Sequence, residues 1–152
     1  MAVAYDAIAA TVAAAMAGNE FAVAAFVHPQ LYRLDDEAHA RAASLFAKTL
    51  GKWMPLWYPL ALLLMLGAFW EHRPGTPSML ILAAGILWAL IIVWTILVLV
   101  PINNRISRLD PQRPYEGWRD DRARWDRLHR IRVGLLILAV FMFLMGLLPT
   151  WN

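Results

Sequence analysis

The chain has 152 residues, of which 61% are hydrophobic and 16% charged, and its mean hydropathy is +0.51. Soluble domains are about 45–50% apolar and about 25% charged. The composition therefore excludes an ordinary soluble domain and predicts an integral membrane protein. Because the chain has no cysteine, disulfides, thiolate metal sites and cysteine-based redox or nucleophilic chemistry are excluded as well.

The net charge of +3 reflects membrane topology rather than nucleic-acid binding. Four Lys and Arg residues lie in segment 28–52 and nine in 101–132, whereas segment 71–77 has one. By the positive-inside rule, segments 28–52 and 101–132 are predicted to be cytoplasmic and both termini extracytoplasmic. In a bacterium this would be the inner membrane. The expected partners are the lipid bilayer and a hydrophobic small molecule; no nucleic acid is expected, and homo-oligomerisation stays open.

Four segments are long and apolar enough to cross a bilayer: 4–27, 53–70, 78–100 and 131–149. A hydrocarbon core of about 30 Å needs about 20 such residues in a helix. The predicted fold is all-α, a four-helix transmembrane bundle that forms a single domain over residues 1–152. A signal peptide at segment 4–27 is disfavoured, because no Lys or Arg precedes it and Asn19 and Glu20 interrupt it.

The first span carries a carboxylate, Glu20, inside an almost wholly apolar stretch, residues 7–27. A charge at the bilayer centre costs at least ~2.5–3.5 kcal/mol, so an ionisable residue at this depth indicates a functional site. The many alanines of this span predict close packing against other helices. Pro29 disfavours helical geometry at His28 and is predicted to end the helix.

The next segment is predicted to form a short amphipathic cytoplasmic helix on the membrane surface, because Ala38, Ala42 and Leu45 recur at helical spacing. Pro55 and Pro59 predict that the second span is tilted or kinked at its start. The same end carries three residues typical of the membrane interface: Trp53, Trp57 and Tyr58. The third span contains no charge and is predicted to face lipid, with Pro101 stopping its helix.

A helical extension is predicted to run directly into the fourth span. Aromatic and charged residues recur in it at intervals of three or four and share one stripe: Trp118, Arg122, Trp125, His129 and Arg132. Asp126 and Arg130 are four residues apart, which predicts an ordinary ion pair on a solvated face.

The topology is predicted to gather polar residues at the cytoplasmic mouth of the bundle. Glu20 would form the floor of this pocket, and the rim would hold His28, Asn103, Asn104, Trp125, His129 and Arg132. A desolvated carboxylate can act as a general base, His can relay protons, and Arg and Asn can stabilise an oxyanion. Trp118 and Trp125 would offer flat walls to an aromatic substrate.

Other interpretations stay open at this point. Glu20, His28 and His129 are candidate metal ligands, and the two histidines are candidate haem ligands, but no HExxH or ExxH spacing supports a metal. The cofactor is therefore undetermined: none, a metal or a haem. Glu20 is also a candidate structural residue, paired with Asn19 to fix helix register, in a non-enzymatic partner or ligand-binding subunit.

Three motifs carry a family resemblance: GNEFAVAAFVHPQL (18–31), VPINNRI (100–106) and WDRLHRIR (125–132). They resemble the small four-helix membrane proteins of the DUF1772 or anthrone oxygenase-like family, over essentially the whole chain. The resemblance implies an oxidoreductase, a cofactor-independent monooxygenase that acts with molecular oxygen on a hydrophobic aromatic or polyketide-type substrate. It implies that Glu20 or His129 removes a proton and that Asn104 and Arg132 stabilise the enolate. His28, Asn103, Trp118 and Trp125 would then bind the substrate.

Overall fold

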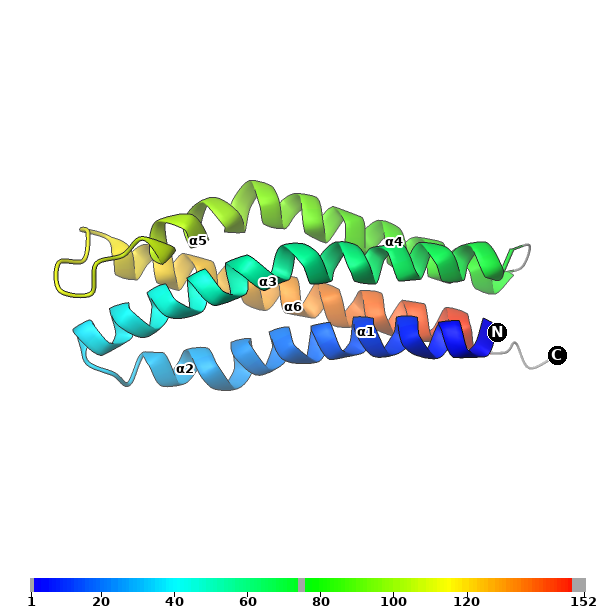
Figure 1. Cartoon of the computed structure of the whole chain (residues 1–152), viewed down its shortest axis with the longest axis horizontal. Coiled ribbons are helices and arrows are strands. Elements are labelled where there is room, and N and C mark those ends of the chain that lie inside the picture. Colours follow the sequence, from blue (N-terminus) through cyan, green and yellow to red (C-terminus); the bar gives the residue numbers. More distant parts are fainter. Residues whose placement is uncertain (1, 74–75, 149–152) are drawn as a thin grey trace.

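The computed structural model describes residues 2–73 and 76–148, and the regular structure in these residues is helical, without strands. Four helical runs are long and apolar enough to cross a membrane: Val3–Leu31, Asp36–Glu71, Ser78–Ser107 and Trp118–Leu147. Figure 1 shows the runs lying lengthwise side by side, with residues 2 and 148 at the same end of the bundle. The all-α, four-helix transmembrane fold is confirmed.

The first run consists of α1 (Ala2–Ala22), the π-helical turn η1 (Val23–Val27) and α2 (His28–Leu31). The predicted helix end at His28 and Pro29 is wrong, since the run continues to Leu31. In η1 the His28 N–H donates to the Val23 carbonyl, five residues back. Pro29 then lies in the first turn of α2, where its missing N–H leaves no helical bond unmade.

The third run contains the same combination of a π-helical turn followed by a proline. It consists of α4 (Thr76–Trp94), the π-helical turn η2 (Thr95–Leu99) and α5 (Val100–Ser107). Pro101 does not stop the helix as predicted, because the Val100 N–H donates to the Thr95 carbonyl and Pro101 again follows in a first turn. Both π turns end two residues before a proline, and π turns are frequent at functional sites.

The second run is a single 36-residue helix, α3 (Asp36–Glu71), which Asp35 caps by accepting from the Ala38 N–H at 2.9 Å. The prediction of a separate surface helix is wrong, because residues 36–52 form the first part of α3. Ala43 and Ala47, in this part of α3, are buried in a cluster with Ile102 and Ile106 of α5 and with Trp125, instead of facing the membrane surface. Pro55 and Pro59 lie inside the helix without interrupting it.

The last run is α6 (Trp118–Leu147), a 30-residue helix, so the predicted extension into the fourth span is confirmed. Gly117 precedes it with a φ of 80°, a conformation that glycine adopts readily. The predicted stripe is buried throughout: Trp118, Arg122, Trp125, His129 and Arg132. The predicted end of the fourth span at residue 149 lies outside the described residues.

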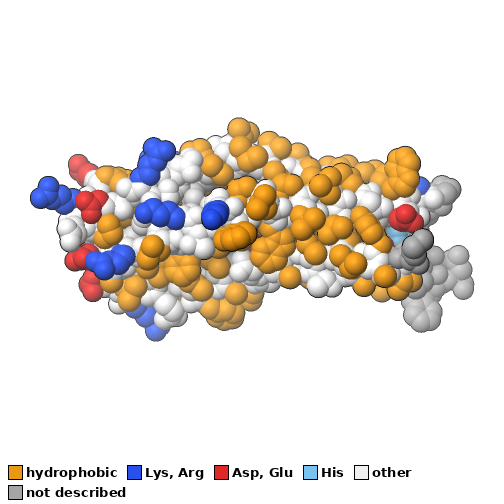
Figure 2. All heavy atoms as spheres, in the orientation of Figure 1, with side chains coloured by type: hydrophobic (Ala, Val, Ile, Leu, Met, Phe, Trp, Pro, Cys, Tyr) orange, Lys and Arg blue, Asp and Glu red, His pale blue; other side chains and the backbone are white. Residues whose placement is uncertain are grey.

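The bundle divides into an apolar body and a charged end. Figure 2 shows most of the visible Lys, Arg, Asp and Glu side chains at one end, beyond a broad hydrophobic belt, with a few at the opposite end. The main core lies within that belt, where Met16, Met65, Trp88 and Phe143 are fully buried among alanines. Large apolar side chains also cover the outside, as expected where lipid is the solvent. The protein is integral to the membrane.

Candidate functional site

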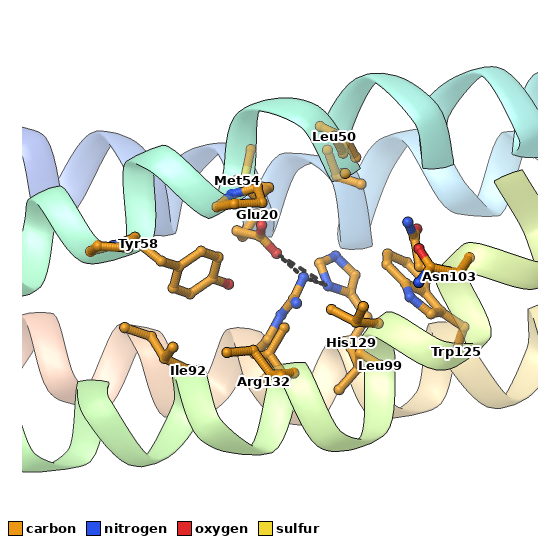
Figure 3. Close-up of a pocket in the computed structure, with 18 residues that line it drawn as sticks. Glu20, Leu50, Met54, Tyr58, Ile92, Leu99, Asn103, Trp125, His129 and Arg132 are labelled. Atoms are coloured by element: carbon orange, nitrogen blue, oxygen red, sulfur yellow. Dashed lines mark hydrogen bonds and ion pairs between the residues drawn. The ribbon is translucent and has the colours of Figure 1, made fainter.

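Glu20 is buried and paired with a cation from the last helix. Its Oε2 accepts a hydrogen bond from Arg132 Nη2 at 2.5 Å and lies 3.2 Å from His129 Nδ1 (Figure 3). The carboxylate is 3% exposed and Arg132 5% exposed. The intramembrane charge is thus compensated by Arg132, and breaking such a buried pair by removing one partner costs about 3–5 kcal/mol.

His129 lies between the two charges. Its Nδ1 is 2.9 Å from Arg132 Nη2 as well as 3.2 Å from the Glu20 carboxylate. A guanidinium only donates and a carboxylate only accepts, so Nδ1 can bond with one of them at a time. When Nδ1 carries hydrogen it donates to Glu20, and Nε2 keeps its lone pair. When Nδ1 accepts from Arg132, Nε2 carries the hydrogen.

His129 Nε2 is buried and has no hydrogen-bond partner among the described residues. The imidazole is held on one side by Trp125, whose ring stacks on it at 4.7 Å with an interplanar angle of 22°. Such unpaired buried polar atoms are uncommon and point to a functional role or a ligand.

A cavity of about 240 Å³ borders this group. Glu20, His129 and Arg132 form its inner wall, and apolar side chains of α3, α4 and η2 form most of the rest (Figure 3). Six of the predicted site residues line it: Glu20, Asn103, Asn104, Trp125, His129 and Arg132. His28 and Trp118 do not.

Two hydroxyl groups of the cavity were not among the predicted site residues. Thr95 Oγ1 is buried and has no hydrogen-bond partner within the described part of the chain, whereas the buried Tyr58 Oη lies near the Glu20 carboxylate and interacts with it. Figure 3 shows the Tyr58 hydroxyl directed toward Arg132 and Glu20, and the Arg132 guanidinium lies 5.6 Å from the Tyr58 ring. Thr95 had a signal in the sequence, since it is a polar residue in an apolar helix, whereas Tyr58 resembled an interfacial aromatic residue.

The two asparagines differ in position. Asn103 is half-buried, and its Nδ2 donates to the Ala47 carbonyl at 3.1 Å, which joins α5 to α3. A Cβ at Gly51 would lie 3.1 Å from the same Nδ2, so glycine gives this amide its room. Asn104 lines the cavity but is exposed, and so lies on its rim.

A second buried polar cluster surrounds Asp126, which is 2% exposed. Tyr32 donates to its Oδ2 at 2.6 Å, while Arg122 Nη2 and His28 Nδ1 lie 2.8 Å and 3.0 Å from Oδ1, at ion-pair distance without hydrogen-bond alignment. The prediction of a solvated Asp126–Arg130 pair is wrong. The buried face of α6 is wider than one stripe, because α5 and η1 contact α6 and because Tyr32 and His39 pack near its start, against Asp126 and Trp118.

Burial and the hydrogen bond to Asp126 raise the pKa of Tyr32 to about 12, so this phenol stays protonated and donates at physiological pH.

The two clusters adjoin. The ring centroid of His28 lies 5.3 Å from that of His129 and 5.2 Å from that of Trp125. Trp118 packs on His39 and beside Leu109, away from the cavity.

Within residues 2–73 and 76–148, no group of three His, Asp or Glu side chains could hold a metal ion. The candidate metal ligands Glu20, His28 and His129 are therefore not assembled as one ligand set. His28 Nδ1 faces Asp126, and His129 Nδ1 faces Glu20 and Arg132.

These features define a four-helix integral membrane protein with a buried carboxylate, guanidinium and imidazole beside an apolar cavity. The chain belongs to the anthrone oxygenase family, DUF1772, whose model matches residues 43–142. The match confirms the family and includes Trp125, His129 and Arg132; it begins after Glu20, so the resemblance of the motif at 18–31 stays a prediction. Comparisons with curated proteins and with solved structures gave no match.

Proposed function

We propose that this protein is a membrane oxygenase that converts an activated CH₂ group of a lipophilic, weakly acidic aromatic compound to a carbonyl with O₂. The family suggests an oxygenase-like role. The observation that carries the proposal is the joining of Glu20, His129 and Arg132 on the inner wall of an otherwise apolar cavity.

The cavity suits a flat apolar body with a polar oxygen. Met54, Ile92 and Leu99 supply apolar surface, and Trp125 adds an aromatic wall. The unpaired hydroxyl of Thr95 is available to hydrogen-bond a ligand oxygen, and the hydroxyl of Tyr58 also borders the cavity. Arg132 places a positive charge where an enolate or phenolate oxygen would carry negative charge, and such charge stabilisation is strong in a water-poor site.

The first chemical step is removal of a proton from the substrate CH₂. We assign the base to His129 Nε2 in the tautomer whose Nδ1–H donates to the Glu20 carboxylate. Glu20 then holds the tautomer and stabilises the imidazolium, while Arg132 stabilises the enolate. A positioned general base contributes about 10²–10⁴-fold to the rate.

The enolate supplies the electrons that reduce oxygen. A C–O bond forms between the carbanionic carbon and O₂, and the peroxide takes the proton back from His129. Removal of the second C–H proton then forms the C=O bond as the O–O bond breaks and hydroxide leaves. That hydroxide and the proton form water, so CH₂ and O₂ give C=O and H₂O without a further reductant.

The test is oxygen uptake and carbonyl formation by purified protein in nanodiscs, with anthrone as the probe and empty nanodiscs as the background. We expect one O₂ consumed per carbonyl formed, without accumulation of hydrogen peroxide. Glu20→Gln, His129→Ala and Arg132→Ala are each expected to lower turnover about 10²-fold or more. His72→Ala, at the far end of the bundle, is the control and should leave turnover unchanged.

Retention of wild-type turnover by all three site variants would show that the assigned roles are wrong. Binding of anthrone without any oxygen uptake would favour a ligand-binding subunit. Metal analysis and an absorption spectrum of the active protein test the cofactor-independent form of the proposal, and a stoichiometric metal or haem would overturn it.

A further inference from the structure

We infer that the cavity is filled sideways from the bilayer, through a window between α3 and η2, by a flat aromatic lipophile carrying one hydroxyl group. The inference rests on the proposed function only in that the cavity holds a ligand. It does not depend on the oxygen chemistry.

The helix packing leaves this window. α3 packs against both α4 and α5, which are successive parts of the third run. The turn between them, η2, makes no comparable contact with α3. The cavity is lined along this gap by some of the α3 residues between positions 50 and 59 and by some of the residues of the third run between positions 92 and 104. The gap is therefore occupied by the cavity rather than by helix contacts.

The exposure of the lining residues gives the direction of the opening. The inner wall is buried, with Glu20, His129 and Arg132 at 3%, 1% and 5% exposure. The exposed residues of the lining all belong to the two edges of the gap: Gly51, Pro55, Pro59, Ile96, Val100 and Asn104. The cavity thus opens outward through the side of the bundle.

Two backbone features hold the edges apart. Pro55 and Pro59 lack N–H groups, and their rings crowd the preceding helical turns of α3, which bends helices. Opposite them, η2 is a π turn, which carries one residue more than an α turn and bulges locally. Thr95 begins this turn with its hydroxyl buried and unpaired within the described residues.

The window lies where the charged end meets the apolar belt. Lys48 and Lys52 are exposed at this level, and the Lys52 ammonium lies 5.6 Å from the ring of exposed Trp53. Leu56 and Leu60, further along α3, are 67% and 49% exposed. Lys and Trp are typical of the membrane interface and leucine of the hydrocarbon layer.

The depth and the lining select the ligand class. A ring system with one hydroxyl group partitions to the interface between headgroups and hydrocarbon, as tyrosine and tryptophan side chains do. A lipid acyl chain in the cavity would leave Thr95 Oγ1 and His129 Nε2 without hydrogen-bond partners. A hydroxylated aromatic compound can pair with them.

The absence of cysteine allows the window to be closed chemically at one position. Ile96→Cys places a thiol on the window edge, and Leu97→Cys places one on the next residue, which is 70% exposed and does not line the cavity. Benzyl methanethiosulfonate is attached in detergent, and the protein is then reconstituted in nanodiscs. The probe is 1-hydroxyanthraquinone, which is stable to oxygen, and its association is followed by quenching of tryptophan fluorescence in a stopped-flow instrument.

We expect the benzyl group at Ile96→Cys to slow association and dissociation of the probe at least tenfold, and reductant to restore both rates. The modified Leu97→Cys protein should stay within twofold of the unmodified one. Equal rates in the two modified proteins, or no binding by the unmodified protein, would overturn the inference. Because no turnover is measured, normal binding with no oxygen uptake would count against the proposed function alone.

A second comparison separates entry from the bilayer from entry from water. As the lipid content is raised at constant total probe, the association rate should follow the mole fraction of 1-hydroxyanthraquinone in the lipid. Anthraquinone-2-sulfonate, which is excluded from the hydrocarbon by its charge, should bind at least tenfold more slowly. A rate that follows the free aqueous concentration for both compounds would contradict entry through the window.

Discussion

Two buried clusters of the same composition lie next to each other in this bundle. Glu20 is paired with Arg132 and His129, and Asp126 with Arg122 and His28. Each contains one carboxylate, one guanidinium and one imidazole, and α6 contributes residues to both. They differ in their surroundings. The Glu20 cluster borders the cavity, whereas the Asp126 cluster is closed by Tyr32 and does not reach it.

The comparison teaches that residue types alone do not define a site in this protein. In the Glu20 cluster the unpaired atom His129 Nε2 belongs to a residue that lines the cavity, whereas the unpaired atoms of the Asp126 cluster, His28 Nε2 among them, belong to residues that do not line it. In the Asp126 cluster the carboxylate receives a phenol as well as the cation and the imidazole. We therefore assign chemistry to the first cluster and a structural role to the second, in which the His28 ring packs against the stacked rings of Trp125 and His129.

The largest expected difference is in turnover. Glu20→Gln removes the charge that stabilises a protonated His129 while keeping the side chain's shape, so turnover should fall about 10²–10⁴-fold. Asp126→Asn makes the same chemical change in the other cluster and should alter turnover far less. Oxygen uptake by folded protein in nanodiscs measures both. Equal losses in the two variants would break the distinction between a reactive and a structural cluster.

The next effect is on stability. Asp126→Asn leaves Arg122 buried without its counter-charge, which should cost about 3–5 kcal/mol in the free energy of unfolding. The double variant Arg122→Met with Asp126→Leu removes both charges and should recover most of that loss, because apolar replacement of a buried pair is often neutral. Denaturation in detergent measures each. A double variant as unstable as Asp126→Asn would show that the pair itself stabilises the bundle.

A smaller effect concerns Tyr32 at high pH. Its pKa is raised from 10.0 to about 12, so the folded state favours the protonated phenol. The associated stability is complete below pH 10 and is lost as the pH rises toward 12. Tyr32→Phe should therefore flatten the fall in melting temperature over this range. Tyr115→Phe is the reference variant. Burial and the bond to Asp121 raise the pKa of Tyr115 to about 12 as well, outside this cluster, so this variant should flatten the fall in melting temperature in the same way. If Tyr32→Phe left the pH profile unchanged, the phenol would not be coupled to Asp126 in solution.

Much of the site could be predicted because its signals are local. Glu20 stands out by hydropathy alone, and helical periodicity placed Trp125, His129 and Arg132 on one stripe, which lines the cavity. The same reasoning failed for Asp126, because an i,i+4 charge pair is typical of a solvated helix and nothing nearby in sequence shows that other helices cover it. Besides Arg122 in the preceding turn, the partners of Asp126 are Tyr32 and His28, which lie 94 and 98 residues earlier in the chain.

The predicted helix ends at Pro29 and Pro101 were wrong for a related reason. Pro29 and Pro101 predict helix ends when every N–H is assumed to bond four residues back. The π turns change that bonding to five residues back, and packing of the continuing helices stabilises the result. The sidedness of the loops and the assignment of one domain remain predictions from charge distribution and length.

Hydropathy, periodicity and short motifs are properties of neighbouring residues, so the membrane location, the four spans, the family and the unusual position of Glu20 could all be predicted without a structure. The contact between Glu20 and Arg132, 112 residues away, the burial of Asp126, and the cavity beside one cluster and not the other became visible only in the folded bundle. These outcomes depend on how far each helix is rotated and bent against its neighbours. That is set by the packing of whole helix faces.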